Sequence, residues 1–276
     1  MDCFQGAHGS PTTGDNCLYE ESVMLRREKL FLFAVVSLAA LCLSAVPARA
    51  AMYDLSARPM GPVTINGAWF YNVETQSTGT GVMDSFIKIQ SNVDVEQGYN
   101  SDGRPVTYDE KNTPNHSLPL TDVPIVSLPG KGMFREFLLD LDEPLAQGQG
   151  LISLDTVQIF LASVGNLTGP VAGLGTPIYN MDIPTPDNYI RLNAGLGHGS
   201  GSGDMYAYIP DALFTGGSFV YLYSKFGESE RPAYAANNNP EEWGVREVST
   251  VVPLPGAVLL GMLGLGEAGL KLRQFA

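Results

Sequence analysis

Cysteine is scarce in this sequence, and its positions exclude several kinds of chemistry from most of the chain. The three cysteines, Cys3, Cys17 and Cys42, all precede residue 50. Disulfides, cysteine-bound metals and thiol nucleophiles are therefore excluded from the remainder of the sequence.

Basic residues and histidine are also sparse. The chain has 16 lysines and arginines against 29 aspartates and glutamates, and its formal net charge is −13. Nucleic acid binding needs a basic surface that displaces counterions from phosphates, so we exclude a nucleic acid partner. After residue 50 the only histidines are His116 and His198, and neither has a serine, aspartate or cysteine at the spacing of a catalytic unit.

Sequence motifs of familiar enzyme classes are absent too. Ser200 and Ser202 do not have a glycine two positions away on both sides, as the G-x-S-x-G motif of a nucleophile elbow requires. The glycine run 195–204 also does not match the dinucleotide-binding pattern, so we expect a flexible connection there. Acidic neighbours are expected to be solvated surface charge, because a glycosidase needs two carboxylates that flank one bond. The sequence therefore predicts a protein that is not an enzyme. The acidic neighbours are Asp109 with Glu110, Asp140 with Asp142 and Glu143, and Glu241 with Glu242.

The N-terminal region has the three parts of a secretory signal peptide over residues 24–50. Charged residues follow Met24, the stretch 30–45 is apolar, and Ala48 and Ala50 form an A-x-A cleavage site. We expect export by the Sec translocon and a mature chain that begins at Ala51. Residues 1–23 fit no targeting signal, so we interpret them as a non-native upstream extension; a genuine short extension is the alternative.

The C-terminal residues 248–276 read as a second targeting segment. The motif Val252, Pro253, Leu254 and Pro255 is followed by an apolar helix over 256–270 and a basic end over 271–276. A helix from residue 257 to 270 would rise about 21 Å at ~1.5 Å per residue, which is short for a bilayer core of about 30 Å. We therefore predict a transient membrane span, with a buried helix of a soluble domain as the alternative.

This tail resembles the carboxyl-terminal signal of PEP-CTERM proteins, in its Val-Pro-Leu-Pro form. It departs from the usual Pro-Glu-Pro pattern at Leu254, and it carries Glu267 in the apolar stretch and few basic residues at its end. Segments such as 98–103, 120–124 and 135–141 also resemble ectodomains of that group. The resemblance implies a Gram-negative envelope, processing by an exosortase at the inner membrane, and release to the cell surface or extracellular matrix.

Residues 51–247 are expected to form the ectodomain. Apolar alternation with a period of two marks short strands at 63–66, 68–73, 84–90, 134–141, 156–161, 189–192, 204–209 and 218–224, while helical periodicity is nearly absent. This pattern predicts an all-β fold, an antiparallel β-sandwich or jelly roll. The Gly/Pro-rich stretch 165–177 is interpreted as a long loop, with a linker between two halves as the alternative.

Aromatic residues offer a candidate glycan-binding surface. Tyr206 and Tyr208 share one face of a predicted strand, as do Tyr221 and Tyr223, so pairing of the two strands would make an aromatic strip on which sugar rings stack. Ordinary stabilisation of a sheet by half-buried tyrosines is the alternative. The candidate glycan contacts are Trp69, Tyr206, Tyr208, Tyr221, Tyr223 and Trp243.

Calcium is the metal that the acidic composition favours, because it takes carboxylate, amide and backbone oxygens from loops. Asn100, Asp102, Asp109 and Glu110 offer such oxygens in a predicted loop over 98–115. We therefore identify these four residues as a possible calcium site, although the spacing is not that of an EF-hand.

Taken together, these patterns predict a secreted, exosortase-sorted surface or matrix protein with a structural or adhesive role. A carbohydrate-binding module that adheres to exopolysaccharide is the alternative. A hydrolase of envelope polymers is a third reading, which only carboxylate chemistry could support.

Overall fold

The computed structural model describes residues 50–58, 61–72, 83–144, 150–183, 187–196, 203–237 and 239–246. Ala48, the signal sequence before Ala50, and the whole predicted tail with Val252 to Pro255 lie outside the described residues. No helix among the described residues is long and apolar enough to cross a membrane.

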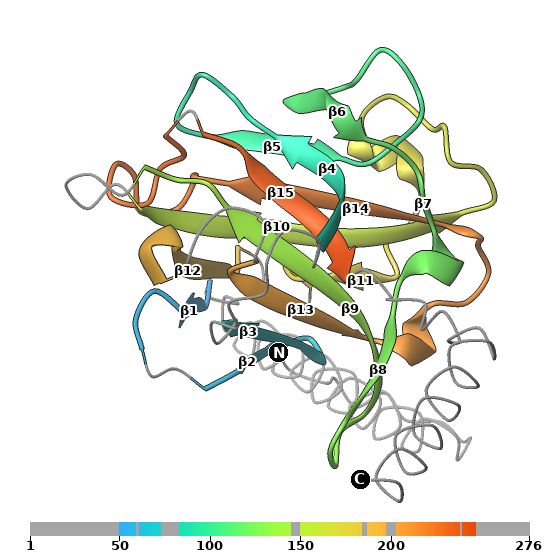
Figure 1. The fold of residues 1–276 in the computed structure, drawn as a ribbon, viewed down its shortest axis with the longest axis horizontal. Coiled ribbons are helices and arrows are strands. Elements are labelled where there is room, and N and C mark those ends of the chain that lie inside the picture. The colour runs from blue at the N-terminus through green and yellow to red at the C-terminus, as the bar shows by residue number, and fades with distance from the viewer. Residues whose placement is uncertain are drawn as a thin grey trace, which may run out of the picture. The chain divides into compact units, whose positions relative to one another are not determined.

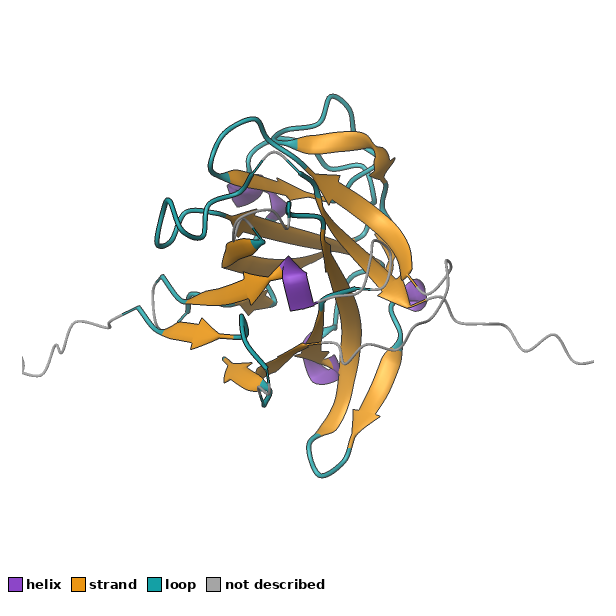
Figure 2. Ribbon diagram, turned by 60° about the vertical axis from the view of Figure 1, so that its left-hand side comes forward, coloured by secondary structure: helices purple, strands orange, loops and turns teal. Residues whose placement is uncertain are grey.

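Strands make up nearly all regular structure in the described residues, which confirms the predicted all-β class (Figure 2). The helices that accompany them are short 3-10 turns: η1 (Leu120–Asp122), η3 (Val171–Leu174), η4 (Ala194–Leu196) and η5 (Asp211–Leu213).

The strands form two sheets (Figure 1). The first sheet has seven strands in the order β1-β12-β10-β14-β5, with β11 beside β10 and β7 beside β14. Its strands are β1 (Met52–Asp54), β5 (Glu96–Tyr99), β7 (Leu118–Pro119), β10 (Leu151–Ala162), β11 (Tyr179–Asn180), β12 (Tyr189–Asn193) and β14 (Phe219–Phe226).

The second sheet has eight strands in the order β2-β3-β13-β9-β15-β4-β6, with β8 beside β9. The β8–β9 hairpin projects beyond the rest of the sheet in Figures 1 and 2. The strands are β2 (Val63–Ile65), β3 (Ala68–Asn72), β4 (Met83–Ile89), β6 (Glu110–Asn115), β8 (Ile125–Leu128), β9 (Gly132–Leu141), β13 (Met205–Pro210) and β15 (Glu241–Arg246).

The predicted antiparallel pairing holds for the described strand pairs with one exception, because β1 runs parallel to β12. Parallel pairing requires a long connection between the strands, and the connection from β1 to β12 includes ten other strands. The predicted loop over 98–115 also differs from the structure, since it contains all of β6. That strand is polar and carries Pro114, so its sequence gave no strand signal; it forms because it pairs with the edge of β4.

Alternation of side chains along the strands buries one face of each sheet in a shared core. In β13, Met205, Ala207 and Ile209 are buried, whereas Tyr206 and Tyr208 are only half-buried. The main cluster of buried apolar residues draws on both sheets, and includes Phe70, Phe86, Phe137, Trp243, Ile152, Ile159, Leu222 and Phe226.

The Gly/Pro-rich stretch 165–177 lies in a loop, with η3 within it, that packs on the outer face of the seven-stranded sheet. It helps to enclose a second cluster of buried residues formed by Tyr99, Phe160, Leu174, Tyr221 and Tyr223. The Tyr221 hydroxyl donates to the Val164 carbonyl (2.7 Å) and accepts from the Leu167 amide (3.0 Å). These bonds hold the loop against β14.

Candidate functional site

The four tyrosines of the predicted aromatic strip lie on two different sheets. Tyr206 and Tyr208 belong to β13, which pairs with β3 and β9, whereas Tyr221 and Tyr223 belong to β14, which pairs with β10, β5 and β7. Tyr221 and Tyr223 are also only 1% and 7% exposed. The single strip is therefore not formed, and these two residues are not surface contacts for a glycan.

Trp243 is likewise a core residue. It is 0% exposed, and its indole N–H donates to the Ser224 hydroxyl of the other sheet at 3.0 Å. Burial with its one polar group satisfied explains the tryptophan without a ligand. The sequence pattern could not separate this position from Trp69, because both tryptophans stand in strand-like segments.

Trp69, Tyr71, Tyr206 and Tyr208 gather on the outer face of the eight-stranded sheet, and we call them the aromatic face. Trp69 of β3 lies opposite Tyr208 of β13, and Tyr71 lies opposite Tyr206. The rings of Tyr206 and Tyr208 stack with centroids 5.5 Å apart and planes 20° apart. All four side chains are half-buried, so each keeps part of its ring accessible.

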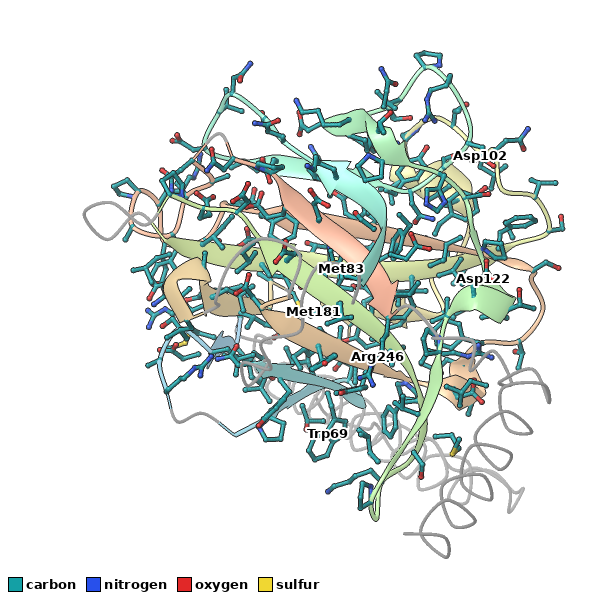
Figure 3. All side chains as sticks on the ribbon, viewed as in Figure 1. Trp69, Met83, Asp102, Asp122, Met181 and Arg246 are labelled. Atoms are coloured by element: carbon teal, nitrogen blue, oxygen red, sulfur yellow. The ribbon has the colours of Figure 1, made fainter. Side chains whose placement is uncertain are left out.

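Charged groups border the aromatic face. The Arg246 guanidinium donates from Nη2 to Glu136 Oε2 at 2.8 Å and lies 5.7 Å from the Tyr206 ring centroid. The Lys131 ammonium lies 4.4 Å from the Trp69 ring centroid, within cation–π range. Burial raises the pKa of the Glu136 carboxyl, and the neighbouring Arg246 opposes that rise. Figure 3 labels Trp69 and Arg246 on this side of the molecule.

Partly exposed aromatic rings flanked by charged groups can stack on sugar rings and bond their hydroxyls. Sequence reasoning identified Trp69, Tyr206 and Tyr208 among these residues but missed Tyr71 and Arg246. Tyr71 carried a signal that could have been read, since it stands two residues from Trp69 and so shares its face. Arg246 carried none, because only strand pairing brings β15 near β13.

Asn100, the first residue of the predicted calcium site, holds backbone instead. It is 0% exposed; its amide nitrogen donates to the Val220 carbonyl (2.9 Å), and its amide oxygen accepts from the Leu222 N–H (2.8 Å). Asn100 thus continues the ladder of β14 beyond the end of β5.

The three carboxylates of that predicted site are also bound to protein N–H and O–H groups. Asp102 accepts from the backbone N–H and the hydroxyl of Ser117. Asp109 accepts from the Gln97 N–H (3.0 Å), and Glu110 from the Tyr99 N–H (2.9 Å). Gln97 and Tyr99 lie on β5, which among the described strands pairs with β14 and ends the order of the seven-stranded sheet. Asp109 and Glu110 therefore cap the free edge of this sheet.

Within the described ranges, no three histidine, cysteine, aspartate or glutamate side chains are grouped so that they could hold a metal ion. The geometry therefore does not form the predicted calcium site at Asn100, Asp102, Asp109 and Glu110. The physical reason is that loop oxygens suited to calcium are equally suited to backbone N–H groups, and these oxygens are used in that way.

The expectation that acidic neighbours are solvated surface charge is wrong for several of them. Glu110, Asp140, Glu143 and Glu241 are 6%, 4%, 4% and 0% exposed. Only their partners in sequence behave as expected: Asp142 is exposed, and Glu242 forms an ion pair with Lys88. For the pair in β15, alternation along the strand sends Glu241 and Glu242 to opposite faces, which explains why only Glu241 is buried.

Of the remaining histidine and serine candidates, only His116 lies among the described residues. His116 is exposed, and its Nδ1 lies 2.8 Å from the Ser117 carbonyl oxygen. His198, Ser200 and Ser202 lie outside the described residues. No protein-family model, curated protein or solved structure matches the chain.

Proposed function

We propose that this chain is an exported, non-enzymatic protein of the cell surface or extracellular matrix, with a structural or adhesive role. In this proposal the Sec translocon exports it, the C-terminal helix spans the inner membrane transiently, and an exosortase processes the motif Val252 to Pro255. The finer fold that we infer is a β-sandwich, since a single core joins the two sheets.

The position of the folded unit carries this proposal. The described β-structure starts with β1 at Met52, directly after the predicted cut, and ends with β15 at Arg246, just before the predicted tail. Removal of both targeting segments would therefore take away no strand of either sheet.

The contacts of Ala51 agree with a cut after Ala50. Its carbonyl accepts from the Tyr189 N–H (3.1 Å), and its nitrogen donates to the Asn188 amide oxygen (3.2 Å). A free amino group at Ala51 can still donate that bond, so cleavage preserves the edge contact between this residue and β12.

Replacement of Pro253 and Pro255 with alanine is expected to block maturation in a Gram-negative host that carries an exosortase. The wild-type product should lose both its signal and its tail, while the variant should retain the tail and stay with the inner membrane. Intact-mass spectrometry of the secreted and membrane fractions measures both outcomes.

Pro129→Ala provides the control, because this residue lies in the exposed turn of the β8–β9 hairpin and should not affect processing. A double variant that is secreted with the wild-type mass and yield would overturn the sorting proposal.

Glycan adhesion through the aromatic face is a second candidate, favoured by the adjacency of Trp69 and Tyr208 across β3 and β13. In gels that contain an acidic or neutral exopolysaccharide, the purified domain should migrate more slowly than in plain gels. Trp69→Ala should raise the dissociation constant from such gels about tenfold, equivalent to ~1.4 kcal/mol of lost stacking.

Ile183→Ala is the matched control, since it removes an exposed apolar side chain that does not belong to the aromatic face. Equal mobility of the wild-type domain with and without a broad set of glycans would reject glycan adhesion, and so would equal retardation of the Trp69→Ala domain.

A further inference from the structure

Three buried glutamates lie toward the same end of the fold. Glu96 comes from β5 of the seven-stranded sheet, Glu241 begins β15 of the eight-stranded sheet, and Glu143 follows the end of β9. Their exposed fractions are 0%, 0% and 4%. We call Glu96, Glu143 and Glu241 the carboxylate cluster.

Strand register brings the cluster together. Glu241 lies between Ile89 of β4 and Leu141 of β9, on the face that these two core residues share. Glu143 stands two residues beyond Leu141, and the backbone N–H two residues beyond Ile89, that of Ser91, donates to Glu96 Oε2 at 2.9 Å. The chain thus carries all three carboxyl groups to the same end of the core.

Among the described residues, at least one oxygen of each of the three carboxyl groups has no hydrogen-bond partner. Glu143 Oε1 accepts from the Asn237 N–H at 3.0 Å, but its Oε2 is unpaired, as are Glu96 Oε1 and both oxygens of Glu241. An ionised carboxylate buried without partners is strongly disfavoured, and a bound proton removes the charge. Since the described side chains form no group able to hold a metal ion, a proton is the neutralising ligand that the geometry leaves.

The surrounding groups add more negative than positive charge. Besides burial, the charges of Glu143 and Asp109 raise the pKa of Glu96, because they oppose its ionisation, and the charge of Lys111 lowers it. The charge of Asp142 likewise raises the pKa of Glu143. Burial, the largest cause in both cases, raises the pKa of Glu96 to about 8 and that of Glu143 to about 7.

We propose that the carboxylate cluster is a proton-controlled latch, which closes the end of the fold where β5, β9 and β15 meet while its carboxyl groups hold protons. Loss of these protons places several like charges at that end of the core, where Glu143 already opposes the ionisation of Glu96, and loosens it. The latch is independent of the sorting and adhesion proposals, since it rests on contacts of the folded unit alone.

The direction of the pH effect follows from the raised pKa values. Between the ordinary glutamate pKa of 4.5 and about 8, Glu96 binds more protons in the folded chain than in the unfolded chain. The stabilisation that Glu96 contributes is therefore fully present below pH 4.5 and is lost as pH rises through about 8. Asp204, whose pKa burial raises to about 7, acts in the same direction. Asp54, Asp102 and Glu230 have lowered pKa values and act oppositely, but only in the acid range.

Thermal unfolding of the full chain between pH 5 and pH 9 tests the latch. The wild-type Tm should fall by about 5–10 °C across this range. Glu96→Gln, which removes a titrating group and keeps its shape, should make the fall shallower and raise the Tm at pH 9 above the wild-type value. Glu242→Gln, at a partly exposed neighbour that pairs with Lys88, is the control and should keep the wild-type slope.

Glu143→Gln serves as a second variant if Glu96→Gln does not fold. A wild-type Tm that stays constant or rises from pH 5 to pH 9 would overturn the latch. So would a wild-type slope in both cluster variants. Calcium at 1 mM that restores the wild-type Tm at pH 9 to its value at pH 5 would also overturn it, because a cation would then bridge the carboxylates.

Discussion

Replacement of Trp243 with alanine should lower the free energy of unfolding by about 3–5 kcal/mol, as expected when a large aromatic residue leaves a cavity in a core. Trp243 is wholly buried and lies between Leu139 of β9 and Ile87 of β4. Its indole N–H also bonds Ser224, so the variant leaves a buried hydroxyl of the other sheet without this partner. Urea unfolding followed by circular dichroism measures the loss.

The same substitution at Trp69 is the matched control. Trp69 is half-buried on the outer face, so Trp69→Ala should cost much less stability than Trp243→Ala. The two variants thus separate the roles of the two tryptophans: one should affect folding and the other glycan retardation. Equal stability losses would contradict the burial described here.

Replacement of Gly227 with alanine should also be strongly destabilising, by about 3 kcal/mol or more. The backbone at Gly227 has a φ of +81°, and an added Cβ would lie 2.2 Å from the Asp94 carbonyl oxygen and 2.5 Å from the Ala236 nitrogen. Those two atoms form a hydrogen bond of 2.9 Å, so relief of the clash requires separation of two backbone segments. Thermal or urea unfolding of the purified variant checks this loss.

Gly216→Ala isolates the conformational part of that effect, without the steric clash. Gly216 has a similar φ of +96°, but nothing lies within 4 Å of an added Cβ. This variant should therefore show only the cost of a left-handed alanine, about 1 kcal/mol. If both variants lost the same stability, the close approach at Gly227 would have no energetic consequence.

Much of the strand content could be predicted from side-chain alternation. The strand expected over 204–209 is β13 (Met205–Pro210), and that expected over 84–90 is β4 (Met83–Ile89). Alternation also gave the correct faces within β13. It reports only local geometry, however, and the partner of each strand depends on contacts made across the whole core.

That limit explains the errors at the candidate site. Tyr206 and Tyr221 look alike in sequence, yet one lies on the aromatic face and the other lies under the loop at 163–178. Likewise, nothing local distinguishes the buried Glu241 from the ion-paired Glu242. Only the register of β15 with β4 and β9 decides which of the two side chains enters the core.

The capping of β5 by Asp109 and Glu110 has a consequence for crowding. An uncovered edge strand recruits a strand from a neighbouring molecule and so seeds fibres. Here the N–H groups of Gln97 and Tyr99 are already occupied by carboxylates of the same chain. Many copies can therefore be packed at high density without strand pairing between molecules along the β5 edge.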